Sequence, residues 1–173
     1  LRMISESRFP YTIVQAPNRT TAAIQVGSGK DAQIYTAEEM VASLLEYAKR
    51  LANDAADGSP VTECVLVVPA FWSPAQRQAL LDAAELAGLN VMSLVHTHAA
   101  AALQYGIERD FTNKTEDVLF YDLGGGAAEA ALVRFSSFQA ADAPAGSPAT
   151  SQFEVKDVSW VDHGVGGDAL EAT

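Results

Sequence analysis

The chain has 173 residues, of which 49% are hydrophobic, and its mean hydropathy is +0.05, values that predict one globular domain or two small ones. A formal net charge of −11 excludes the basic surface that binding to a nucleic-acid backbone requires. The single cysteine, Cys64, excludes an internal disulfide, and no stretch approaches the roughly 18 consecutive apolar residues of a membrane-spanning helix. We therefore expect neither nucleic acid nor a membrane as a partner.

Residues 10–35 contain three short runs rich in strand-forming residues, YTIVQA, TAAIQV and AQIYT. The turn clusters PNRT and GSGKD separate them. Runs of this kind with Asn, Gly, Ser and Pro between them predict a small antiparallel meander at the front of the chain.

A long helix is predicted to follow, because Thr36 is a good N-cap and Glu39 stands three residues later, where it completes a capping box. Asp57-Gly58 ends this helix. Apolar residues recur at helical spacing and are expected on one face: Met40, Val41, Leu44, Leu45, Ala48, Leu51 and Ala52.

The next elements alternate between strand and helix. The run ECVLVVP is continuously apolar, which predicts a strand covered on both faces. Ser73 and Pro74 open a second helix that ends at Gly88, VMSLV is the next strand, and Ala99 to Gly106 form a short helix. This order is typical of βαβ units in an α/β protein.

The C-terminal third is predicted to be mostly β. The strand VLFYD runs into three glycines, and the strand AEAALVRF follows closely enough to form a hairpin with it. Ala140 to Ser151 have the composition of a surface loop, FEVKDVSWV resumes strand alternation, and DHGVGGD is a second glycine-rich turn. The expected fold class is α/β with a mixed sheet, flanking helices and a small β-rich front.

The triple glycine of FYDLGGGAAEAALV allows two interpretations. Gly124, Gly125 and Gly126 leave backbone N–H groups uncovered, which suits a nest for phosphate oxygens. Asp122 before them is suited to hold Mg²⁺ through water, and Glu129 offers a second carboxylate. The alternative is a permissive turn without a ligand.

Three stretches resemble the ATPase domain of the 70-kDa heat-shock protein family, within the actin-like superfamily. They are VPAFWSPAQRQALLDAAELAGLNVMSLV, YDLGGG, which is similar to the family's phosphate loop, and the later VGGDALE. The resemblance covers residue 30 to the end in one order. It implies an actin-like (ribonuclease H-like) fold, incomplete here, that binds ATP or ADP with Mg²⁺.

By this resemblance the nucleotide-binding positions include Asp122, Gly124, Gly125, Gly126 and Ala127. They also include Glu129, Gly166 and Gly167, with Asp122 and Glu129 on the side of the metal and Asp122 as the candidate catalytic residue. Residues 1–35 are expected to form a β-rich part of lobe I, 36–113 its helices and strands, and 114–173 the start of lobe II.

Further features resemble the large endoplasmic-reticulum branch of the family, the hypoxia up-regulated or 170-kDa glucose-regulated type. They are RFP near the start, YTAEEMVASLLEYAKRLA and the tyrosine in FYDLGGG. The branch implies a lumenal chaperone that holds unfolded clients and promotes nucleotide exchange on a conventional lumenal partner; a cytoplasmic location is the alternative. The sequons at Asn18 and Asn113, both in predicted turns, favour the lumen and a glycoprotein.

Two positions depart from the family pattern. Thr97 stands where the family has a glutamate that orients catalytic water and metal, and Ala127 stands where it has a threonine close to the terminal phosphate. The family's first phosphate loop and catalytic lysine are expected upstream of Leu1, so we expect an excerpt of a longer protein that has no useful turnover by itself.

Three other hypotheses compete with this one. His96 and His98 would face one side if they lay on a strand, as a metal pair does, with His163 in the second glycine turn, but two polar substitutions of a family motif explain the pair more simply. A nucleotide-independent scaffold with a degenerate site is the main functional alternative. An actin-like small-molecule kinase is the third.

Overall fold

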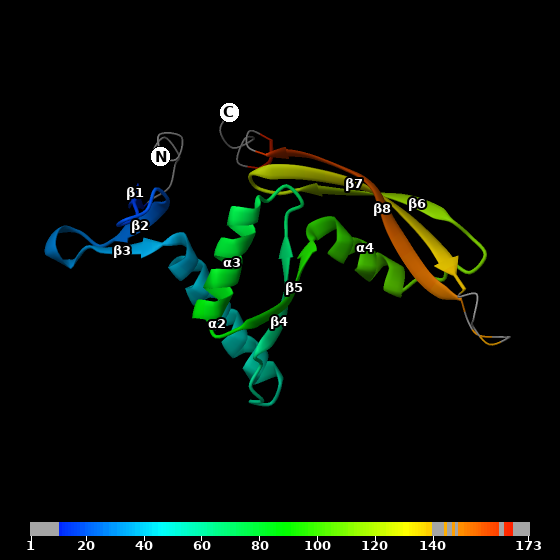
Figure 1. Cartoon of the computed structure of the whole chain (residues 1–173), viewed down its shortest axis with the longest axis horizontal. Coiled ribbons are helices and arrows are strands. Elements are labelled where there is room, and N and C mark those ends of the chain that lie inside the picture. Colours follow the sequence, from blue (N-terminus) through cyan, green and yellow to red (C-terminus); the bar gives the residue numbers. More distant parts are fainter. Residues whose placement is uncertain (1–10, 140–143, 145–146, 148, 163–164, 168–173) are drawn as a thin grey trace. The chain divides into compact units, whose positions relative to one another are not determined.

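A computed structural model describes residues 11–139, 144, 147, 149–162 and 165–167. The chain divides into two compact units (Figure 1): Leu1–Leu66 with Trp72–Ser93, and Val67–Phe71 with Leu94–Thr173. Helices and several small sheets are both present, so the predicted mixed α/β class is confirmed. The division into three parts that the resemblance implies stays a prediction.

The front of the first unit is the predicted antiparallel meander. It consists of β1 (Thr12–Gln15), β2 (Ala22–Val26) and β3 (Gln33–Thr36), paired in the order β1-β2-β3, with the short 3₁₀ helix η1 (Gly29–Asp31) before β3. Ala16 and Ala23 are buried in it. The turn between β1 and β2 contains Asn18 with a φ of 60°, a left-handed conformation that asparagine tolerates better than most residues.

Helix α2 (Ala37–Ala55) begins with the predicted capping box: the Glu39 N–H donates to Thr36 Oγ1 over 3.2 Å, and the Thr36 N–H donates to Glu39 Oε2 over 2.7 Å. The Thr36 N–H and the Thr36 hydroxyl, whose Oγ1 lies 3.0 Å from Glu39 Oε2, both donate to the Glu39 carboxylate and lower its pKa below the usual value. The predicted single apolar face is only partly correct, because Leu44 and Leu51 are 69% and 52% exposed. Ala42 of α2 is buried in a cluster with Ala83 and Ala87, and Val41 and Leu45 are partly buried against this cluster.

Helix α3 (Pro74–Leu86) also begins as predicted, with Ser73 and Gln76 in a capping box and Pro74 at the first helical position. Strands β4 (Glu63–Val68) and β5 (Asn90–His96) form a two-stranded sheet. The prediction that β4 is covered on both faces is wrong: its side chains alternate, and Val65 and Val67 are 55% and 51% exposed. Among the described residues β4 has one strand neighbour, so a continuous apolar run does not by itself produce a strand buried on both sides.

The end of α3 is capped by a side chain from α2. Lys49 Nζ donates to the carbonyl oxygens of Ala87 and Gly88 over 3.2 and 2.8 Å, and Gly88 has a φ of 66°, as is common after a helix. We expect Lys49→Met to lower the free energy of unfolding by about 1 kcal/mol, because two carbonyls at the negative end of α3 lose a charged donor. Urea denaturation measures this, with Lys30→Met, at an exposed lysine, as the control that should change little. Equal losses in both variants would contradict the role of Lys49.

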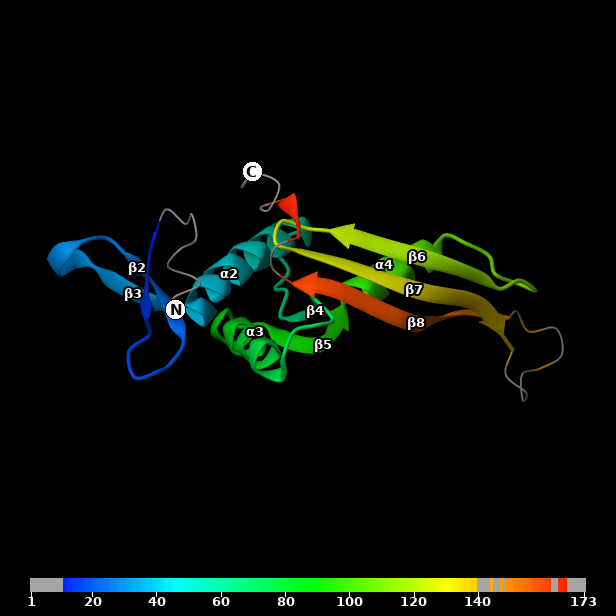
Figure 2. The same cartoon turned by 90° about the horizontal axis from the view of Figure 1, so that it is seen from above.

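The second unit contains a three-stranded antiparallel sheet in the order β6-β7-β8 (Figure 2). Its strands are β6 (Glu116–Leu123), β7 (Ala127–Phe138) and β8 (Thr150–Asp162), and α4 (Thr97–Ile107) packs on one face. The predicted hairpin around the glycines is therefore confirmed. The core under α4 consists of Ala102, Phe111, Ala131, Val133 and Phe135, with the Phe111 and Phe135 rings stacked 4.9 Å apart.

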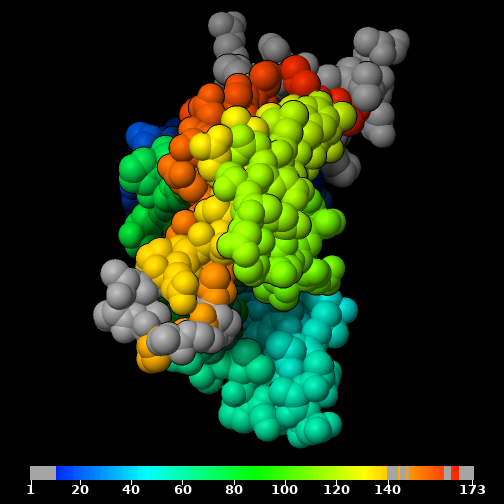
Figure 3. Space-filling model, turned by 90° about the vertical axis from the view of Figure 1, so that its right-hand side faces the viewer, coloured from blue at the N-terminus to red at the C-terminus, as the bar shows by residue number. Residues whose placement is uncertain are grey.

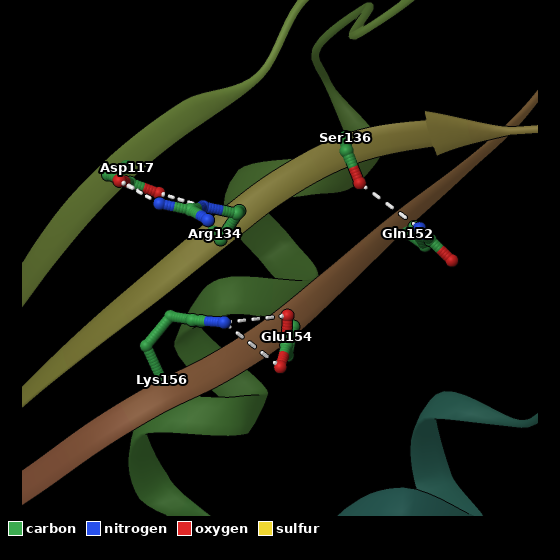
Figure 4. A network of polar contacts seen from close by, with 6 residues as sticks. All are labelled: Asp117, Arg134, Ser136, Gln152, Glu154 and Lys156. Carbon is green, nitrogen blue, oxygen red and sulfur yellow. Dashed lines mark hydrogen bonds and ion pairs between the residues drawn. The ribbon is translucent and has the colours of Figure 1, made fainter.

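The other face of this sheet is polar at one end. In Figure 4, Arg134 holds Asp117 of the neighbouring strand by two bonds of 2.7 Å, whereas Lys156 pairs with Glu154 on the same strand. Hydrogen bonding to Arg134 lowers the pKa of Asp117. Further along β6, Leu119 and Tyr121 are 67% and 66% exposed. Figure 3 gives a space-filling view in which atoms of β6 are yellow-green, those of β7 yellow and those of β8 orange.

Candidate functional site

The two carboxylates that the sequence singled out lie opposite each other on the glycine hairpin. Asp122 on β6 and Glu129 on β7 are direct cross-strand partners, so their side chains lie on the same face of the sheet. Both line a pocket of about 250 Å³. The other residues around it are Thr97, His98, Ala101, Phe120, Tyr121 and Ala131. Asp122 is exposed, whereas Glu129 is buried.

The three glycines between the strands use one of their amides to close the turn. The Gly124 N–H donates to the carbonyl oxygen of Ala127 over 2.9 Å. Within the part of the chain that the structure describes, the N–H groups of Gly125 and Gly126 have no hydrogen-bond acceptor. The turn therefore leaves two adjacent donors at exposed glycines close to Asp122, where an anion could approach them.

The second glycine turn packs directly on the first. The Gly167 N–H donates to the carbonyl oxygen of Gly124 over 3.1 Å. Gly166 has a φ of 143°, and a Cβ atom placed on it would lie 2.3 Å from the carbonyl oxygen of Gly125. Gly166 and Gly167, which the resemblance gives as nucleotide-binding positions, are thus in contact with the glycine hairpin, and their role towards a nucleotide stays a prediction.

We expect Gly166→Ala to lower the free energy of unfolding by about 2 kcal/mol, because both the backbone conformation and the neighbouring carbonyl exclude a side chain. Thermal and urea unfolding measure the loss. Gly29→Ala is the matched control: its φ of 64° is also positive, but no atom lies within 4 Å of the added carbon. Should the two variants lose the same stability, the close packing of the two turns would not be what requires Gly166.

Glu129 is held by three donors from two other segments. Thr97 Oγ1 donates to Oε2 over 2.6 Å, and the Ala70 N–H and His98 Nδ1 lie 3.2 and 3.3 Å from Oε1. Burial raises the pKa of the Glu129 carboxyl, but the hydrogen bonds from Thr97, Ala70 and His98 outweigh it, and the pKa is lowered. The Glu129 carboxylate is therefore kept ionised inside the fold.

The histidine pair does not have the geometry proposed for a metal site on one strand. His96 ends β5, while His98 lies in the first turn of α4 and its ring is 5.4 Å from that of His96. His98 instead contacts Glu129. Among the described residues no group of three or more His, Cys, Asp or Glu side chains could hold a metal ion, and His163 lies outside them.

The remaining residues of interest have ordinary structural surroundings. Trp160 stacks on Phe71 with 6.2 Å between ring centroids and is 49% exposed, and Ala127 is the first residue of β7. Asn18 and Asn113 are exposed in turns with φ of 60° and 59°, so the predicted turn positions of both sequons are confirmed. No described helix has the length and apolar character needed to cross a membrane.

The partnership of Thr97 and His98 with Glu129 is the feature that the sequence did not predict. In the sequence, Thr97 indicates only the loss of a carboxylate, and His98 only one half of a histidine pair. Thirty-two residues separate Thr97 from Glu129. No local pattern links positions this far apart, and only the packing of α4 on the sheet brings them together.

Comparison with known proteins gives the family. The family model described as "Hsp70 protein" matches residues 4–167. The chain is 41% identical over 162 residues to "Heat shock 70 kDa protein 17" of Arabidopsis thaliana, an alignment that covers 94% of this chain and 18% of the relative. It is 34% identical over 140 residues to "Hypoxia up-regulated protein 1" of Mus musculus, covering 79% of this chain and 14% of the relative.

The human "Hypoxia up-regulated protein 1" gives a similar result, with 33% identity over 141 residues, 80% of this chain and 14% of the relative. The chain therefore spans less than a fifth of the length of these relatives. Its helices and small sheets are consistent with part of the actin-like ATPase fold. The match over most of the chain, together with the glycine hairpin and its two carboxylates, shows that this chain belongs to the Hsp70 family.

Proposed function

We propose that the second unit supplies part of an ATP- or ADP-binding site, with the glycine hairpin at the phosphates. The observation that carries the proposal is the exposed pair of N–H groups at Gly125 and Gly126 beside Asp122. Gly166 and Gly167 support this loop, because their backbone packs on the Gly124 and Gly125 carbonyls. Gly124 and Ala127 close the turn that presents the amides.

The residues present fit a hydrated magnesium ion. Mg²⁺ keeps most of its waters and binds through one or two carboxylates plus phosphate oxygens, so an all-protein cage is not needed. Asp122 and Glu129 line one pocket and supply carboxylate oxygens. Bound Mg²⁺ would neutralise phosphate charge, while Asp122 would accept hydrogen bonds from its waters and the glycine amides would orient the phosphate.

Nucleotide at this site would act mainly as a conformational ligand. Thr97 cannot serve as a carboxylate base, and its hydroxyl is already donated to Glu129. Ala127 has no hydroxyl to offer a phosphate. Binding would then stabilise the conformation that has the higher affinity for nucleotide, with slow turnover or none, and Asp122 is the candidate for any residual catalytic contact.

For the protein as a whole we propose the role of a chaperone of the large endoplasmic-reticulum type, located in the lumen. Its partners would be unfolded clients and a conventional lumenal chaperone whose nucleotide exchange it promotes. The identities of 33–34% to two hypoxia up-regulated proteins support this branch. The exposed turns at Asn18 and Asn113 would accept N-linked glycans, as expected of a lumenal glycoprotein.

A second candidate function is a nucleotide-independent scaffold. The observation in its favour is that Glu129, one of the two carboxylates, is buried and held by three intrachain donors. Calorimetric titration of the full-length protein with MgATP separates the two candidates. Saturable binding is expected, and the absence of heat at every concentration would favour the scaffold.

A further inference from the structure

We infer that Thr97 and His98 are positioning residues that orient the Glu129 carboxylate toward a metal-bound water in the pocket that it shares with Asp122. This inference rests on the proposed nucleotide site and assigns a role to two of the residues that depart from the family pattern. The starting observation is that both side chains contact the same carboxylate, one at each oxygen.

The three contacts leave one direction open at the carboxylate. A carboxylate has about four lone-pair sites, two on each oxygen. Oε1 faces two donors, the Ala70 N–H at 3.2 Å and His98 Nδ1 at 3.3 Å, whereas Oε2 accepts one short bond of 2.6 Å from Thr97. Counting donors from the described residues, Oε2 therefore keeps one site for a further donor, and Glu129 lines the pocket beside Asp122.

The surroundings fix this arrangement firmly. Glu129 and His98 are 8% and 7% exposed, and no described buried side-chain polar atom is left without a partner. Thr97 and His98 occupy the first turn of α4, whose N-terminal end favours a nearby negative charge. A carboxylate held in this way loses little freedom when it accepts a hydrogen bond from a bound water.

A purely structural role for Thr97 would affect stability alone, whereas a positioning role also affects how strongly Mg²⁺ strengthens nucleotide binding. The test uses the full-length protein and calorimetric titration with ATP, first with Mg²⁺ and then with EDTA in its place. The measured quantity is the ratio of the two dissociation constants, with the thermal midpoint recorded for each variant.

The variants are Thr97→Val, which keeps the shape but removes the hydroxyl, and Thr97→Ser, which keeps the hydroxyl. We expect Thr97→Val to reduce the Mg²⁺ enhancement by roughly tenfold, about the value of one hydrogen bond to a charged group, and Thr97→Ser to retain it. His98→Ala is a second variant, expected to reduce the enhancement in the same direction.

The outcomes separate this inference from the function on which it rests. If the unmodified protein binds ATP more tightly with Mg²⁺ and Thr97→Val keeps the same ratio, the positioning role is overturned and the nucleotide site stands. If the unmodified protein binds no nucleotide under either condition, the proposed function is overturned and this inference with it. A lower thermal midpoint with an unchanged ratio also overturns the positioning role, because it leaves only a structural contact.

Discussion

Replacement of Asp122 by alanine is expected to weaken MgATP binding by about 100-fold or more. Asp122 is the exposed carboxylate at the end of β6, close in sequence to the exposed glycines Gly125 and Gly126. Its removal takes away an acceptor for the waters of a hydrated cation, and hydrogen bonds to charged groups contribute roughly 1.5–3 kcal/mol each. Calorimetric titration of the full-length variant with MgATP measures the loss.

The matched control for this variant is Asp117→Ala. Asp117 lies five residues earlier on the same strand, so its side chain is on the opposite face, where it pairs with Arg134. Both changes remove one exposed carboxylate from β6, and we expect Asp117→Ala to leave MgATP affinity nearly unchanged. Equal affinity in the unmodified protein and the Asp122 variant would contradict the placement of the nucleotide at this hairpin.

Replacement of Glu129 by alanine is expected to lower the free energy of unfolding by about 3 kcal/mol. The change leaves Thr97 Oγ1, His98 Nδ1 and the Ala70 N–H without their shared acceptor in a buried site. Leaving a buried polar group unsatisfied costs roughly 1–3 kcal/mol, and the space left by the side chain adds to this. Urea denaturation at neutral pH measures the difference.

The same variant has a predicted pH dependence. The folded-state pKa of Glu129 is lowered, so its carboxylate stabilises the fold above the unfolded-state pKa of about 4.3, and this stabilisation is lost as pH falls through the lower folded-state value. The stability difference between the unmodified protein and Glu129→Ala should therefore shrink in acid below about pH 4.3. Glu154→Ala, at an exposed glutamate of β8, should show little difference at either pH. A gap for Glu129→Ala that is constant with pH would contradict the ionised state of this carboxylate.

The sequence predicted the local elements well, because their signals are local. Thr36 with Glu39 and Ser73 with Gln76 are capping boxes within four residues, and both mark helix starts in the structure. The glycine hairpin follows in the same way from two strand-forming runs around three glycines. Capping boxes and tight hairpins are formed by residues that are close in sequence, so they can be predicted without knowing the rest of the fold.

The predictions that failed concern which faces are covered. Val65 and Val67 belong to an unbroken apolar run, yet both are exposed, because burial depends on what packs from elsewhere and hydrophobicity alone does not supply it. Leu44 and Leu51 on α2 are exposed for the same reason. The hydrophobic pattern indicates which residues could be buried, but which of them are buried depends on the segments that pack against the strand or helix.

The candidate site also combines features that are local in sequence with contacts that are long-range. Asp122 and the glycines could be picked out as a candidate phosphate site because they are close in sequence, and because a carboxylate beside bare backbone amides suits a phosphate with Mg²⁺. The contacts of Glu129 with Ala70, Thr97 and His98 span 31 to 59 residues and bring together the segment after β4, the start of α4 and strand β7. The substitution of Thr97 could be noticed from the sequence, but its hydrogen bond to Glu129 required the fold.

The most direct measurement is amide hydrogen exchange of the full-length protein, followed by mass spectrometry of peptides that cover residues 120–129, with and without MgATP. If the Gly125 and Gly126 amides hold phosphate, these peptides should exchange more slowly when MgATP is present, and the protection should be absent in Asp122→Ala. Binding of MgATP with unchanged exchange in these peptides would place the nucleotide elsewhere and contradict the account.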